Sequence, residues 1–197
     1  MNRFSRPRLD SLTDGIFAFA MTVLVLDIRL PPDLPLTSAA DLTAHLVSLW
    51  PQTLTYVISF FVLGAHWRGI AEARTNAETA TSTQVQLQLV YLFFVTLVPF
   101  SSSLVGTYGS LAPAIFFYAG NMIALSVFAI ALRFKDIPPT EPASLRRAAG
   151  THLPVFIASA ALSALLALVV PEHAMLAYLL NLITRLPGRR TSGGPKR

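Results

Sequence analysis

Long apolar runs separated by short basic clusters constrain the fold of this chain more than any other feature. A membrane-spanning helix needs roughly 17–25 mostly apolar residues, and stretches approaching that length lie at about 12–28, 42–67, 85–105, 112–132, 152–170 and 173–186. Only 13% of the residues are charged, whereas soluble domains carry about 25% charge. We therefore expect an all-α integral membrane protein with six transmembrane helices per subunit.

The basic residues predict how these helices are oriented. Lys and Arg collect in cytoplasmic loops, and all but one of the 15 basic residues lie on the same side of a six-helix arrangement. The exception is Arg29. This split places both termini in the cytoplasm. We assign residues 1–187 to one transmembrane domain and expect the Gly- and Arg-containing stretch 188–197 to be a disordered basic tail.

Several functional classes are excluded by what the sequence lacks. The chain has no cysteine, which removes disulfides, thiolate metal sites and cysteine nucleophiles. Its four histidines are too scattered for a metal-ligand spacing. It contains no phosphate-binding glycine loop, no paired catalytic carboxylates and no recognised nucleic-acid motif. We expect neither an enzyme nor a bound cofactor or metal, and no nucleic-acid partner.

The first predicted helix carries two carboxylates at unusual positions. Asp14 and Asp27 are thirteen residues apart, which is roughly 20 Å of helix and well short of a hydrocarbon core of about 30 Å. An ionisable residue within the membrane is by default a hypothesis of function. The alternative is that the bilayer thins locally, or that the helix is buried among its neighbours.

An apolar stripe runs between these carboxylates. Phe19, Val23, Leu26 and Leu30 follow i, i+4, i+7, i+11 spacing, and Thr22 lies alongside. Such a stripe is typical of a packing face, but it would also suit the wall of a narrow pore that gates by dewetting. The spacing alone does not decide between these two interpretations.

The residues around this helix carry a family resemblance. Arg8, Asp14 and the glycine after it, followed by the apolar run 16–28, resemble the opening of the transmembrane protein 175 family of potassium channels. Segments 58–67 and 99–101 are similar to parts of that family's second and third helices. The resemblance covers about residues 8–105.

The resemblance implies a homotetramer in the inner (plasma) membrane, with helix one lining a pore for potassium or other monovalent cations. It implies no filter loop of the usual potassium-channel type. The residues that it assigns are a constriction of Phe19, Val23 and Leu26, a selectivity hydroxyl layer at Thr22, a signature network of Arg8, Thr13, Asp14, His66 and Trp67, and a pore mouth at Asp27.

Two departures from the family leave alternatives open. Phe19 stands where the family usually has Ile or Leu, and its larger ring could occlude the pore or turn aside. The paired histidines that often follow the family's tryptophan are absent after Trp67, where His66 could substitute. An ion- or proton-coupled secondary transporter using Asp14 is the main alternative function, and a non-conducting structural protein is a third. We also expect Arg8 and Asp14 to pair between helices or subunits.

Overall fold

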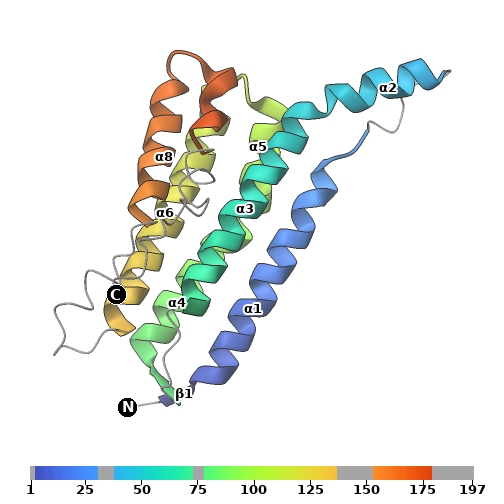
Figure 1. Ribbon diagram of the computed structural model, residues 1–197. Helices are drawn as coiled ribbons and strands as arrows, with labels where there is room; N and C mark the ends of the chain where they lie inside the picture. Colours follow the sequence, from blue (N-terminus) through green and yellow to red (C-terminus); the bar gives the residue numbers. More distant parts are fainter. Residues whose placement is uncertain (1–2, 31–37, 73–77, 137–152, 179–197) are drawn as a thin grey trace, which may run out of the picture.

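The computed structural model describes residues 3–30, 38–72, 78–136 and 153–178 (Figure 1). Within these ranges the chain is almost entirely helical. The helices are α1 (Arg6–Val23), continued by the 3₁₀ turn η1 (Leu24–Asp27), α2 (Ala39–Ser48), α3 (Trp50–Glu72), α4 (Ser82–Thr96), α5 (Val98–Tyr108), α6 (Ala112–Asp136), α8 (Leu153–Leu166) and the 3₁₀ segment η2 (Pro171–Tyr178).

Four helical stretches are long and apolar enough to cross a membrane: 6–27, 50–72, 82–108 and 112–135. This confirms a mostly helical protein with several helices that could cross a membrane. The predicted fifth segment forms α8, which has only 14 residues, and the described part of the sixth is the eight-residue η2. The rest of the sixth segment and the tail 188–197 lie outside the described residues. The six-helix count and the cytoplasmic termini therefore stay predictions.

The predicted second segment, 42–67, was expected to kink at Pro51, and in the structure it is two separate helices. The chain breaks at Leu49 between α2 and α3, because Pro51 has no N–H to donate and its ring disfavours a helical turn before it. Helix α2 projects away from the other helices (Figure 1), and none of its residues is buried. The spanning helix is α3, which begins at Trp50 and runs five residues beyond Trp67.

The predicted third segment is interrupted near its middle. Helix α4 ends at Thr96 and α5 begins at Val98, just before Pro99, which cannot donate to the preceding turn. Helix α5 continues to Tyr108 before the chain turns toward α6. The turn follows, where the Leu111 amide donates to the Tyr108 carbonyl over 2.8 Å.

Two three-residue strands hold the start of the chain against the connection before α4. Strand β1 (Arg3–Ser5) pairs antiparallel with β2 (Thr79–Thr81), with Phe4 opposite Ala80. Thr81 then caps α4 in a reciprocal exchange with Gln84, which satisfies amides that the first helical turn leaves free. The sequence analysis did not predict these strands.

The core lies where α1, α3, α4, α5 and α6 meet, and α8 packs against α6 on the far side (Figure 1). Several buried polar groups inside it are paired with one another. The Ser59 hydroxyl donates to Ser102 Oγ over 3.0 Å and lies 3.0 Å from the Tyr118 hydroxyl. Because an unpaired hydroxyl in an apolar interior costs free energy, this cluster fixes how α3, α5 and α6 pack together.

Candidate pore helix and its polar contacts

Helix α1 packs on the bundle through one face. Thr13, Phe17, Ala20 and Leu24 are buried, and Phe17 is only 1% exposed. Their spacing is i, i+4, i+7, i+11, which keeps them on one side of a helix. The Phe17 ring lies 6.1 Å from the Tyr91 ring of α4. This face fixes the position and rotation of α1 within the subunit.

The opposite face of α1 has no neighbour within the described part of the subunit. Phe19 and Leu26 are each 68% exposed, and Gly15 and Thr22 are also exposed. Val23 is half-buried. Val23 shares the i, i+4, i+7 spacing of Phe19 and Leu26 but lies at the edge of this exposed face, whereas Thr22 is exposed with the other two.

The Thr22 hydroxyl is oriented by its own helix. Its Oγ1 donates to the Phe19 carbonyl over 2.8 Å. Since the only hydroxyl proton is used within the helix, the oxygen lone pairs remain available as acceptors on the exposed face. This geometry suits an interaction with a cation or with a water hydrogen.

Polar contacts connect the first half of α1 to its neighbours. The Trp67 indole Nε1 of α3 donates to Asp14 Oδ1 over 2.9 Å. The buried Thr13 hydroxyl donates to the Leu9 carbonyl and accepts from Gln88 Nε2 of α4, each over 2.9 Å. Asp14 and Trp67, predicted as members of one network, are thus brought together. Gln88 was missed, although an amide within an apolar run is a recognisable signal.

His66 lies deeper, within the core between α3, α4 and α8. It is buried, its Nδ1 is 3.4 Å from the Tyr91 hydroxyl, and its ring centroid lies 4.7 Å from that of Phe156 with the ring planes tilted by 34°. Tyr91 and Phe156 were not predicted as neighbours of His66. Those contacts join segments that are far apart in the chain, so no local sequence pattern predicts them.

Arg8 is exposed in the single subunit. Among the described residues of this part of α1, an ion pair joins Arg6 to Asp10, with 3.9 Å between Nε and Oδ1. The expected pairing of Arg8 with Asp14 of another subunit stays a prediction.

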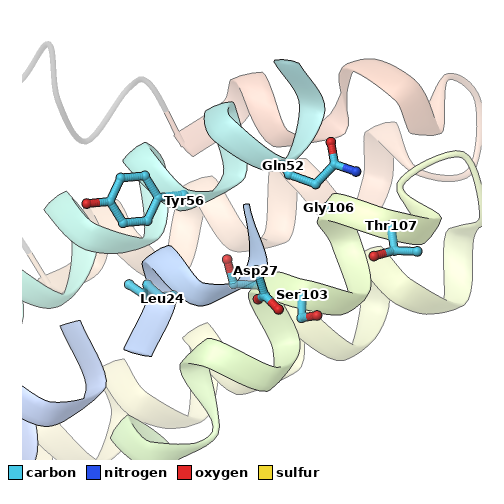
Figure 2. A pocket seen from close by; sticks show the side chains of 8 residues that line it. Leu24, Asp27, Gln52, Tyr56, Ser103, Gly106 and Thr107 are labelled. Carbon is cyan, nitrogen blue, oxygen red and sulfur yellow. The ribbon is translucent and has the colours of Figure 1, made fainter. Parts of the chain in front are cut away.

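Asp27 ends η1 and faces a small pocket toward α3 and α5 (Figure 2). The pocket residues are Leu24, Asp27, Gln52, Tyr56, Ser102, Ser103, Gly106 and Thr107. Asp27 borders this pocket, which is formed within one subunit, and its predicted place at a pore mouth stays a prediction. Among the described residues no group of three or more metal-ligating side chains occurs.

A bundle of long apolar helices with several polar side chains paired internally is the architecture of a polytopic α-helical membrane protein. The family described as the endosomal/lysosomal potassium channel TMEM175 matches residues 8–99. Over this region the chain is similar to the TMEM175 family.

Relatives by sequence agree with this assignment. The chain is 30% identical over 101 residues to a potassium channel of Streptomyces collinus, a match that covers 51% of this chain and 48% of that protein. It is 28% identical over 125 residues to a potassium channel of Chamaesiphon minutus, covering 61% and 60%. The matches thus span about half of these relatives' lengths. The mouse endosomal/lysosomal proton channel TMEM175 is 31% identical over 100 residues, covering 48% of this chain and 20% of that protein.

Two solved structures share the fold. A lysosomal potassium-selective channel TMEM175 homologue from Chamaesiphon minutus superposes with a TM-score of 0.71 at 24% identity, covering 91% of this chain and 98% of that one. A threonine-to-alanine variant of the potassium channel MtTMEM175, solved with a nanobody fusion, gives a TM-score of 0.58 at 14% identity, covering 92% and 91%. At these identities the likeness establishes the fold.

Proposed function

We propose that this chain forms a potassium-selective, or weakly selective, cation channel, in which the exposed face of α1 lines the pore of a homotetramer. The subunit would span the inner membrane six times with both termini in the cytoplasm. The observation that carries the proposal is the unpartnered face of Phe19, Thr22 and Leu26 on a helix whose other face is packed. The named functions of the relatives favour a pore over a lipid contact for this face.

The chemistry of that face suits the passage of a cation. Rings of Phe19 and Leu26 would form apolar layers that exclude water, as hydrophobic constrictions do. Thr22 lies between them and keeps its oxygen lone pairs available. A potassium ion losing hydration at the apolar layers would regain oxygen contacts at Thr22, and the Phe19 ring could add a cation–π interaction of about 0.5–2 kcal/mol.

Electrical recording from purified protein in planar bilayers tests this proposal. We expect small unitary currents in the unmodified protein, and larger currents with weaker preference for potassium over sodium in Phe19→Ala. Leu26→Ala is the matched variant, because Leu26 is as exposed as Phe19 and would form the apolar layer on the other side of Thr22. If Phe19→Ala changes neither current nor ion preference while Leu26→Ala changes both, the constriction belongs to the Leu26 layer. Absence of unitary current from every variant would refute the channel.

A coupled transporter using Asp14 remains the second candidate, because a carboxylate with an indole partner lies inside the first spanning stretch. The same preparation separates the two functions. Asp14→Asn in a transporter would abolish uphill ion uptake into liposomes driven by a second ion gradient. A channel would show no uphill uptake in either form.

A further inference from the structure

The pocket behind η1 contains an unusual set of oxygen atoms. Asp27 approaches it from the end of the α1–η1 helix, and Ser103 and Thr107 approach it from α5, one helical turn apart (Figure 2). Leu24, buried on the packed face of α1, forms part of the wall. The pocket therefore lies on the bundle side of the first helix, away from the face of Phe19 and Leu26.

These oxygen atoms lack the partners that comparable groups nearby possess. Several hydroxyls elsewhere in the spanning helices donate to their own helix, as Thr55 does to Pro51 and Ser126 to Met122, and Ser59 donates to Ser102 of another helix. Within the described residues, no hydrogen bond or ion pair engages the Asp27 carboxylate or the Ser103 and Thr107 hydroxyls.

Gln52 supplies a further oxygen at the α3 wall. Its Oε1 is buried and has no hydrogen-bond partner in the described structure. A buried acceptor of this kind calls for a water or an ion to satisfy it. Rotating the terminal amide group of Gln52 by 180° exchanges its oxygen and nitrogen, so the partner that it binds determines which of the two faces the pocket.

Gly106 holds the two walls close together. A Cβ at this position would lie 3.3 Å from Gln52 Cα, so a larger residue would push α5 away from α3. Both walls are regular helix at this level. The separation of the α3 and α5 walls is thus fixed by helix packing.

We propose that this pocket binds one monovalent alkali cation, held by the Asp27 carboxylate and the neutral oxygens of Ser103, Thr107 and Gln52. All candidate ligands are oxygens, which hard cations prefer. The site carries one formal negative charge, which balances a single positive charge. Sites for divalent cations commonly use several carboxylates. The C-terminal end of a helix adds a partial negative charge at Asp27.

A cation at this position would connect three helices within one subunit. It would hold the end of η1 to α3 and α5 and thereby fix the end of the first helix that follows Leu26. This is a structural ion site, separate from the permeation path assigned to Phe19 and Thr22. Its existence does not rest on the channel function.

Thermal unfolding of the purified full chain in detergent tests the site. K⁺, Na⁺ and the bulky cation N-methyl-D-glucamine are compared at equal ionic strength. We expect the melting temperature to rise with K⁺ or Na⁺ and not with the bulky cation, because ligands that bind only the folded state stabilise it by mass action. Asp27→Asn should raise the half-saturating concentration by at least about tenfold, since it removes the charge.

Two further variants control for folding and for pore binding. Thr107→Val removes one ligand oxygen at nearly constant volume and should weaken the cation effect, whereas Thr107→Ser should keep it. Thr22→Val removes the hydroxyl of the proposed pore and should leave the effect unchanged. A rise that survives Asp27→Asn but disappears in Thr22→Val would place the cation in the pore and overturn the proposal.

Crystals grown in Rb⁺ give a direct readout, an anomalous peak between Asp27 and the α5 hydroxyls. A melting temperature insensitive to all three cations, or one raised by Ca²⁺ alone, would overturn the monovalent site. Currents without a cation-dependent melting temperature would refute this site and leave the channel proposal standing. A cation-dependent melting temperature without currents would support this site and refute the channel proposal.

Discussion

The two faces of α1 carry the same kinds of side chain in opposite surroundings. Leu24 is 1% exposed and Leu26 is 68% exposed, although they are two residues apart. Phe17 and Phe19 differ in the same way. Thr13 is tied to Gln88, whereas Thr22 bonds only within its own helix. The comparison teaches that residue type does not identify the packed face in a membrane, where apolar side chains suit lipid, core and pore wall alike.

The phenylalanine pair should give the largest difference between the faces. Phe17→Ala removes a buried ring beside Tyr91 and should lower the free energy of unfolding by about 3–5 kcal/mol. Phe19→Ala should change it by no more than about 0.5 kcal/mol in the isolated subunit, because its ring touches little there. Denaturant unfolding in detergent measures both. Equal losses of unfolding free energy in the two variants would mean that the assignment of a packed face and an exposed face is wrong.

The threonine pair should give a smaller difference. Thr13→Val leaves the buried Gln88 amide without its acceptor, which should cost about 1–3 kcal/mol. Thr22→Val on the exposed face should cost almost nothing. Adding Gln88→Leu to Thr13→Val should recover part of the loss, since both polar partners are then gone. A double variant as unstable as the sum of the single variants would argue against the coupling.

The contact between Asp14 and Trp67 sharpens the comparison at the edge of the packed face. Trp67→Phe removes the indole donor and should cost about 1–2 kcal/mol, since bonds to charged groups are the stronger ones. The loss should shrink in an Asp14→Asn background. Tryptophan fluorescence follows the unfolding of every variant, because Trp50 is retained in each of them. An undiminished loss in that background would assign the effect to packing of the ring.

Glycine substitutions should give the smallest change in stability, and this change should be a stabilisation where the preceding variants destabilise the subunit. Added Cβ atoms at Gly15 and at Gly120 of α6 would meet no atom within 4 Å. Both Gly→Ala variants should therefore stabilise the subunit by up to about 1 kcal/mol through helix propensity. Oligomer mass in detergent should not change. If Gly15→Ala alone reduced the oligomer, the exposed face of α1 would be a contact between subunits instead of a pore wall.

Some of the fold and site could be predicted because it rests on local properties. Apolar length located the spanning stretches of α4–α5 and α6 to within a few residues, and those of α1 and α3 with starts that differ by six and eight residues. The prolines signalled the interruptions, although the sequence alone did not tell a kink at Pro51 from the actual break between α2 and α3. The Asp14 and Trp67 motif residues do meet.

The sequence by itself predicted that the helices of this protein suit a lipid bilayer and where the first of them lies, because hydropathy and helical period are properties of a few turns of chain. Only the tertiary structure decided which face of that helix is free, since Phe17 and Phe19 are chemically identical and differ only in what α4 covers. It also decided that Asp27 borders a pocket formed with α3 and α5. Contacts between distant segments depend on how the helices cross, and no local pattern encodes that geometry.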